Sequence, residues 1–107
     1  MSAPRKYHNR LTEVDGITFH SRAEAARYQE LRLLERAGEI ADLILQPAYP
    51  LVVNGVRVGK YVGDFAYTER DGRRVLEDVK GVKTAVYQLK KRLMAALYGI
   101  VITEVMR

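Results

Sequence analysis

The sequence predicts an α/β fold of the α+β kind, in which helices cover a mixed sheet, and three observations support this prediction. Two stretches with helical spacing are separated by short β-rich runs. The dipeptides Asp15-Gly16 and Asn54-Gly55 favour tight hairpin turns. A short apolar run follows the second helical stretch, and a strand after a crossover helix usually pairs parallel to an earlier strand. We therefore expect an N-terminal β-hairpin followed by an α-β-β-β-α-β core.

The composition fits one small domain with a basic surface. A chain of 107 residues can bury one hydrophobic core, and its 18 basic against 13 acidic residues give a net charge of +5. This excess favours a polyanionic partner such as DNA, although RNA-binding proteins share it. Cysteine is absent, which excludes disulfides, thiol catalysis and thiolate zinc sites. No apolar run approaches the roughly 18 residues of a membrane span, so we expect a cytoplasmic protein without a membrane partner.

The N-terminal third predicts an arm, a hairpin and a helix. Residues 1–10 are polar and basic, so we expect a flexible basic arm ahead of a single domain over residues 11–107. A short hairpin forms around Asp15-Gly16. Ser21 then begins a helix of four to five turns that Gly38 stops. The apolar residues expected to pack against the sheet are Ala23, Ala26, Leu33, Leu34 and Ala37.

Glu24 has two interpretations. It stands three residues after Ser21, as in a capping box, where its carboxylate would bond back to the Ser21 amide. It could equally lie in a functional site at the start of the helix. Helical spacing alone does not choose between the two.

The middle of the chain predicts the three core strands. Pro47 makes the apolar stretch of residues 40–47 a connector. Residues 49–53 and 56–67, joined by Asn54-Gly55, are the first two core strands. Residues 75–80 form the third.

A second helix and a last strand follow. Residues 84–98 predict the helix, which Gly99 ends, and the β-rich residues 100–105 form the strand. The apolar stripe expected to face the core consists of Ala85, Val86, Leu89, Leu93, Ala96 and Leu97.

Two groups of basic side chains are candidates for contact with DNA. The helix face opposite the apolar stripe carries Tyr87, Lys91, Met94 and Tyr98, and its flank carries Lys83, Lys90 and Arg92. Lysine beside tyrosine suits phosphate contacts and base stacking, so Lys83, Tyr87 and Lys91 are candidate DNA-binding residues. A solvated face and a dimer interface are the alternatives. The second group, in the turn before the third strand, is Arg70, Arg73 and Arg74, which either contacts a nucleic-acid backbone or keeps the turn solvated.

Three charged residues in two neighbouring strands indicate a catalytic site. Asp64 lies in the strand predicted for residues 56–67, and Asp78 and Lys80 lie two positions apart in the next strand. Two carboxylates that converge on a cation, with an ammonium beside them, are what metal-dependent hydrolysis of a phosphodiester requires. This predicts a site for Mg²⁺ or Mn²⁺. The alternative is that Asp64 is a polar residue at a strand end and that Lys80 pairs with a surface carboxylate.

The turn between these strands decides whether the carboxylates meet. A two-residue Asp71-Gly72 loop would put Asp64 opposite Val79, on the wrong face. A three-residue loop from Arg70, with Gly72 in a left-handed conformation, would put Asp64 opposite Asp78. Like charges at that distance repel unless a positive charge lies between them. The predicted metal site therefore requires the three-residue loop.

Gly63-Asp64 followed by Asp78-Val79-Lys80 resembles the core signature of the PD-(D/E)XK nuclease superfamily, which includes restriction endonucleases and Holliday-junction resolvases. One departure is visible, because Gly63 stands where the family name has Pro. The chain is most similar to small phage- and prophage-encoded members, over nearly its whole length. The segments that carry this similarity are Gly16-Ile17-Thr18-Phe19-His20-Ser21, Glu24, Gln46-Pro47, Gly63-Asp64-Phe65, Glu77-Asp78-Val79-Lys80-Gly81 and Thr84.

The resemblance implies a restriction-endonuclease-like core and a role for each site residue. Asp64, Asp78 and the carbonyl of Val79 would hold the metal. Lys80 would position the attacking water or stabilise charge on the phosphate, and Glu24 would complete the site. Some relatives carry a site residue on the helix after the third strand, which leaves Gln88 and Lys91 as further candidates.

These observations together predict a small Mg²⁺-dependent DNA endonuclease, encoded by a phage or prophage and acting in the bacterial cytoplasm. A chain of 107 residues offers little surface for surrounding a duplex, so we expect a homodimer. Branched DNA such as a Holliday junction is then a candidate substrate, by analogy with relatives. The alternatives are a non-catalytic nucleic-acid-binding module and a structural phage protein on a nuclease-like fold.

Overall fold

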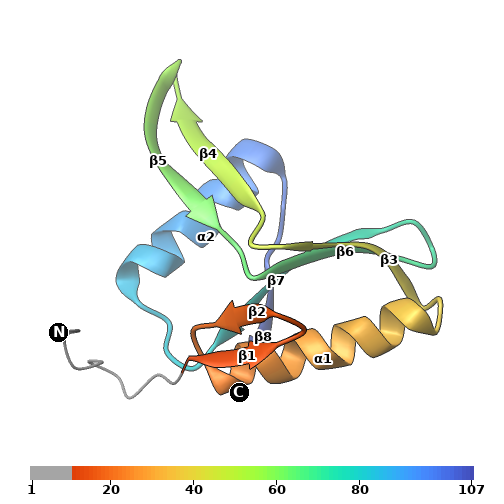
Figure 1. The fold of residues 1–107 in the computed structure, drawn as a ribbon. Coiled ribbons are helices and arrows are strands. Elements are labelled where there is room, and N and C mark those ends of the chain that lie inside the picture. Colours follow the sequence, from red (N-terminus) through yellow and green to blue (C-terminus); the bar gives the residue numbers. More distant parts are fainter. Residues whose placement is uncertain (1–10) are drawn as a thin grey trace, which may run out of the picture.

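The computed structural model describes residues 11–107, and the basic arm predicted for residues 1–10 lies outside this part of the chain. Figure 1 shows a small sheet between two helices, with a two-stranded ribbon that rises away from it. The elements in chain order are β1 (Thr12–Val14), β2 (Ile17–Phe19), α1 (Arg22–Arg36), β3 (Ile40–Leu45), β4 (Ala48–Val53), β5 (Val56–Val62), β6 (Phe65–Glu69), β7 (Arg74–Lys80), α2 (Ala85–Tyr98) and β8 (Thr103–Met106).

The central sheet has four strands in the order β3-β6-β7-β8. β6 pairs antiparallel with both β3 and β7, whereas β8 pairs parallel to β7, as expected for a strand that follows a crossover helix. β1 and β2 form the N-terminal hairpin, with Asp15 and Gly16 both at positive φ. The mixed sheet, the two helices and this hairpin confirm the predicted α+β fold class.

The ribbon of β4 and β5 continues the pairing of β3 with β6 beyond the sheet. The pairs across the corner are Leu45 with Phe65, Gln46 with Asp64, Pro47 with Gly63, and Ala48 with Val62. β3–β4 and β5–β6 are therefore the two arms of one long antiparallel hairpin, closed by Asn54-Gly55 and bent in the middle. Gln46 adopts a φ of +51° at this bend.

Three strand predictions are wrong because of this bend. Residues 40–45 form a strand of the sheet, not a connector, since Pro47 interrupts the pairing only where the hairpin bends. Residues 49–53 belong to the ribbon and not to the core sheet. Residues 56–67 form two strands, because Gly63-Asp64 stands at the corner between β5 and β6.

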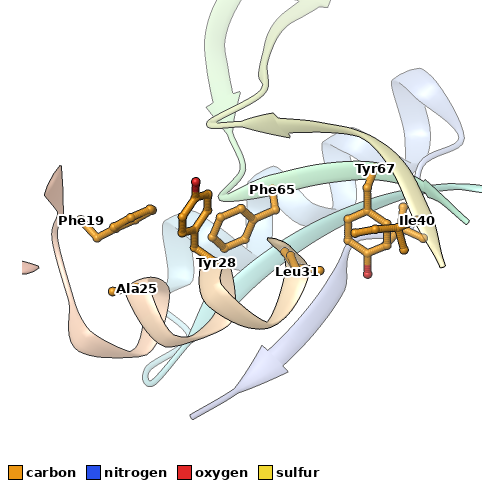
Figure 2. Close-up of a cluster of buried hydrophobic side chains, with 8 residues drawn as sticks. Phe19, Ala25, Tyr28, Leu31, Ile40, Phe65 and Tyr67 are labelled. Carbon is orange, nitrogen blue, oxygen red and sulfur yellow. The ribbon is translucent and has the colours of Figure 1, made fainter. Parts of the chain in front are cut away.

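Two hydrophobic clusters cover opposite faces of the sheet, because side chains alternate along each strand. Phe65 and Tyr67 point to the face that α1 covers, where Figure 2 shows Phe65 beside Tyr28 and Tyr67 beside Ile40. Ala66 points to the face that α2 and the base of the ribbon cover. That second cluster consists of Leu51, Tyr61, Ala66, Leu76, Tyr87, Met94 and Ile102.

The ends of both helices follow the sequence signals. The Ser21 hydroxyl oxygen accepts a hydrogen bond from the Glu24 amide at the start of α1, and Thr84 caps α2 in the same way. Gly99 ends α2 in the left-handed conformation with a φ of +67°. Within residues 11–107, neither helix is long and apolar enough to cross a membrane.

The sides that the helices present to the sheet differ from the prediction. α1 buries Ala25, Tyr28 and Leu31 and leaves Leu33 64% exposed. α2 buries Tyr87 and Met94, while Val86 on the predicted core stripe is 62% exposed. Because α2 is apolar on two sides, the larger side chains, which fill the space over the sheet, determine its orientation.

Candidate active site

The turn between β6 and β7 is the three-residue loop that the metal site requires. The Glu69 amide donates to the Arg73 carbonyl at 2.8 Å, and the Gly72 amide donates to the Glu69 carbonyl at 2.9 Å. Gly72 has a φ of +88°, which favours glycine. The resulting register pairs Phe65 with Glu77, so the next residue of each strand, Asp64 and Asp78, stand opposite each other. The predicted register is confirmed.

Asp64 lies at the bend, where the chain leaves the ribbon and enters β6. Its amide donates to the Glu77 carbonyl at 3.0 Å, and its carboxylate accepts a hydrogen bond from the Val79 amide at 2.7 Å. Burial raises the pKa of Asp64 to about 7, and the negative charges of Asp78 and Glu24 act in the same direction. The Val79 amide opposes this shift without reversing it.

Asp78 is almost completely buried, at 4% exposure, and both of its oxygens have partners. Oδ1 lies 3.1 Å from the Lys80 ammonium, and Oδ2 accepts a hydrogen bond from the Tyr61 hydroxyl. The Lys80 ammonium also stands 4.1 Å from the centroid of the Tyr87 ring, a cation–π contact. Two acids, one ammonium and two tyrosines therefore form the centre of the site.

The carbonyl of Val79 points to the edge of β7 on which Asp64 lies. Successive residues of a strand direct their backbone groups to opposite neighbours. The Lys80 carbonyl accepts from the Arg107 amide beyond β8, whereas the Val79 amide donates to Asp64 on the other side. The Val79 carbonyl shares the edge of its own amide, next to the two carboxylates.

Glu24 approaches the site from the first turn of α1. It lines a pocket of about 560 Å³ together with Val79 and Lys80. Burial raises the pKa of Glu24; His20 lowers it, and the charge of Asp78 raises it again. The Ser21 half of the capping box is formed, and among residues 11–107 the Ser21 amide donates no hydrogen bond to the Glu24 carboxylate. A hydrogen bond with the Ser21 side chain lowers the pKa of Glu24 in part. The position of Glu24 thus agrees with the functional interpretation as well as with a cap.

A second buried acid, Glu77, was not singled out by the sequence. It is 0% exposed on the α1 face of β7. Arg27 donates to both of its oxygens, at 2.9 Å and 2.7 Å, and the Tyr67 hydroxyl donates to one of them. Fifty positions separate Arg27 from Glu77, so no local pattern marks the pair. This ion pair joins α1, and with it Glu24, to the strand that carries Asp78.

The presence of glycine at position 63, where the PD-(D/E)XK signature has proline, has a structural cause. A Cβ at this position would lie 2.8 Å from the Leu76 side chain and 3.5 Å from the Glu77 carbonyl oxygen. The Gly63 amide also donates to the Pro47 carbonyl at 2.9 Å, a bond that proline lacks the hydrogen to make. In this chain the position before Asp64 therefore favours glycine, since a larger residue would displace the Leu76 side chain and proline would lose the hydrogen bond to Pro47.

The predicted DNA-binding face of α2 turns Tyr87 and Met94 toward the sheet, so base stacking on Tyr87 is not possible. Contact between DNA and Lys83 or Lys91, whose side chains are 41% and 37% exposed, stays a prediction. Tyr87 is 6% exposed, and its hydroxyl donates to Glu104 at 2.8 Å. Lys83 and Lys91 lie 3.1 Å and 3.2 Å from the other oxygen of Glu104, which stands beside Asp78 on β8. These partners lower the pKa of Glu104 to about 2, the Tyr87 hydroxyl first among them. Lys91 is thus engaged away from Asp78.

The arginines of the β6–β7 turn are exposed at the other end of the hairpin. Arg70 lies 3.4 Å from Glu39, Arg73 lies 3.0 Å from Glu69, and Arg74 donates to Thr68 at 2.8 Å. Five residues separate Glu69 from Asp64, which places the turn roughly 17 Å along the strand from the site. Contact between these arginines and DNA stays a prediction. Such a contact would be made with a part of the DNA away from the candidate site.

The two carboxylates and the Val79 carbonyl are the groups that can hold a cation. No cluster of three or more His, Cys, Asp or Glu side chains suited to a metal occurs within residues 11–107. The predicted set contains two acids and a carbonyl, so it does not depend on such a cluster.

Comparison with known families places the chain. Residues 4–106 match the model of a family described as "Protein of unknown function (DUF1064)". The chain belongs to this family. No curated protein matches the chain. The family description names no activity, so the geometry of the site is the basis for a proposed function.

Proposed function

We propose that this chain is a Mg²⁺- or Mn²⁺-dependent nuclease that hydrolyses phosphodiester bonds in DNA. The observation that carries the proposal is the opposition of Asp64 and Asp78, with Lys80 3.1 Å from Asp78. Two opposed acids next to an ammonium are unfavourable as a purely structural device, because like charges repel. They are favourable as a site for a divalent cation and a phosphate.

The residues present fit a divalent cation. Asp64, Asp78 and the Val79 carbonyl would hold it, since carboxylate and carbonyl oxygens are the ligands that Mg²⁺ prefers. The raised pKa of Asp64, about 7, has burial as its first cause and neighbouring acids as its second. A positive charge between the two acids would offset the part of the pKa increase that the neighbouring acids cause. When bound, the cation would supply Lewis-acid activation of water and phosphate.

The protein's own side chains would orient the reaction. Tyr61 donates to Asp78 and fixes the orientation of this carboxylate. Lys80, held between Asp78 and the Tyr87 ring, presents its ammonium to the negative charge that develops on the phosphate. Glu24, beside Lys80, can hold a water or accept its proton.

A cleavage assay tests the proposal directly. Linear, nicked, flapped and four-way-junction DNA are each incubated with the full chain and Mn²⁺, with parallel samples in chelator. We expect cleavage of at least one substrate, dependent on the cation and lost in Asp78→Asn. Asp71→Asn, which removes an exposed acid of the β6–β7 turn, is the matched control and should cleave like the wild type. The panel also reports whether branched DNA is preferred.

The alternative functions predict different results in the same assay. A non-catalytic binding module would retain DNA in a mobility-shift measurement and cleave none of the substrates. A structural protein on a nuclease-like fold would show neither cleavage nor cation-dependent stabilisation. Cleavage that persists in Asp78→Asn would contradict the assigned site. The proposed place of action is the bacterial cytoplasm, with a phage or prophage as the source of the chain.

We extend the proposal to a homodimer because the outer face of α2 is apolar. Val86, Leu89 and Leu97 are 62%, 50% and 38% exposed. Their spacing of three or four residues, continued by Leu93, is that of a helix–helix interface. An exposed apolar stripe of this kind marks an interaction surface. A second copy related by two-fold symmetry presents the same stripe and covers it.

Sedimentation velocity tests the dimer. The wild type should sediment as a dimer, and Leu89→Lys should sediment as a monomer, because it buries a charge in the interface. Leu33→Lys changes a leucine on α1 that is 64% exposed and serves as the control. A monomeric wild type at all concentrations would contradict the homodimer and leave the nuclease proposal in place.

A further inference from the structure

We infer that Lys60 and Lys90 form a phosphate-binding subsite that holds the substrate backbone beside the phosphate to be cleaved. The inference rests on the proposed function. Both lysines line a pocket of about 280 Å³ next to the active site. Asp78, Tyr61 and Lys80 line the same pocket, so it opens directly onto the catalytic groups.

Lys60 and Lys90 differ from the other lysines of residues 11–107 in their ion pairing. The chain has five lysines within residues 11–107. Lys80 pairs with Asp78, and Lys83 and Lys91 both pair with Glu104. In the described part of the chain, Lys60 and Lys90 are the two that form no ion pair. They come from different elements, β5 and α2, and nevertheless line one pocket.

The position of Lys90 strengthens the case for an anion. Its side chain is partly buried in a pocket that Lys60 and Lys80 also line. Removing an ammonium from water without a counter-ion is unfavourable, and several ammonium groups around one pocket repel one another. An anion from solution satisfies all of them. Phosphate is the anion that a nuclease substrate carries.

The arrangement of the pocket indicates which phosphate binds there. Asp78 is one of the residues that line the pocket, and its negative charge disfavours an anion beside it without a cation between them. Lys60 and Lys90 therefore suit a phosphate farther along the strand than the one that is cleaved. Val62 also lines the pocket and gives apolar surface for a sugar. The lysines would hold the strand in register with Asp64 and Asp78.

Binding without cleavage tests this subsite. A fluorescein-labelled single-stranded oligonucleotide is titrated with the full chain in chelator at several salt concentrations, and anisotropy gives Kd. Each lost phosphate contact should reduce the slope of log Kd against log salt by about 0.7. We expect this reduction for Lys60→Ala and for Lys90→Ala, about twice as much for the double variant, and recovery of the slope in the two Lys→Arg variants.

A matched variant controls for net charge. Arg36→Ala removes one exposed positive charge at the far end of α1, roughly 18 Å along the helix from Glu24, and should leave the slope unchanged. A folded double variant with the wild-type slope would overturn the subsite, and so would a wild type that does not bind the oligonucleotide.

Cleavage assays separate this inference from the proposed function. A wild type that cleaves, together with a double variant that keeps the wild-type slope and KM, overturns the subsite and leaves the nuclease standing. A wild type that binds with a lysine-dependent slope and cleaves nothing supports the subsite and removes the nuclease.

Discussion

Two adjacent acids of β7 are both buried, and their surroundings are opposite. Glu77 faces α1 and receives two guanidinium hydrogen bonds from Arg27 and one from a tyrosine hydroxyl. Asp78 faces α2 and meets one ammonium, Lys80, together with a second acid, Asp64. Burial alone therefore does not distinguish a structural acid from a functional one. The ratio of acids to cations does, because it leaves negative charge at Asp78 and none at Glu77.

The largest effect that this comparison predicts is loss of cleavage on the Asp78 face. Asp64→Ala, Asp78→Ala and Lys80→Ala should each lower kcat by about a thousandfold or more while the protein stays folded. The two aspartate variants should also lose Mn²⁺ affinity in calorimetric titration. Lys80→Ala should keep most of it, because an ammonium cannot bind a cation. Equal Mn²⁺ affinity in all variants and the wild type would contradict the assigned ligands.

The role of Glu24 gives the next prediction. Glu24→Gln keeps a side chain that can cap the helix and removes the charge beside Lys80. Activity should fall about a hundredfold, as for the loss of a general acid or base, with the melting temperature within about 1 °C of the wild type. Glu13→Gln, in the N-terminal hairpin, is a control that should change neither quantity. An active Glu24→Gln protein would return this residue to a purely structural role.

On the opposite face, Glu77→Gln should act on stability first. It removes the buried counter-charge of the Arg27 guanidinium and leaves only the exposed Glu30, 3.4 Å away, which costs about 3 kcal/mol of unfolding free energy in urea denaturation. The double variant Arg27→Met/Glu77→Leu removes both charges and should regain most of this loss. A Glu77→Gln protein as stable as the wild type would show that the two acids do not differ as the comparison requires.

The smallest effect concerns the pH dependence of stability in chelator. The pKa of Asp64 is about 7 in the folded chain, above the usual value near 4, so the folded state holds this proton more tightly than the unfolded state. Stability from this group is therefore greatest below pH 4 and is lost as pH rises toward 7. Asp64→Asn should melt roughly 5 °C higher than the wild type at pH 8 and at the same temperature at pH 4. A difference that does not depend on pH would contradict the raised pKa.

Local signals in the sequence predict much of this fold and also part of the geometry of the site. Ser21 and Gly99 mark helix ends because capping depends on one or two residues. Gly72 determines the register of β6 with β7, because its positive φ selects the three-residue loop and thereby brings Asp64 opposite Asp78. A turn residue eight positions from Asp64 thus controls the geometry of the site.

Features that depend on distant partners could not be predicted in this way. The orientation of α2 depends on the large side chains Tyr87 and Met94, which fill the space over the sheet. It also depends on Glu104, which binds Tyr87 and Lys91 from a strand later in the chain. The apolar stripe of α2 was assigned to the core because periodicity cannot distinguish two apolar sides. Arg27 and Glu77 lie on different elements, and the bend at Gln46 and Pro47 is visible only once β3 is known to pair with β6. Such contacts need the fold before they can be recognised.

The bend in the long hairpin lies at one end of the β4–β5 ribbon, so the candidate site at the bend and the ribbon tip are separate parts of the molecule. Asp64 and Tyr61 lie at or next to the bend, while the Asn54-Gly55 tip lies at the far end of β4 and β5. Insertion of two residues into each ribbon strand preserves the alternation of faces and moves the tip by roughly 7 Å. The length of the ribbon can therefore change in steps of two residues per strand while the relative positions of Asp64 and Asp78 stay constant.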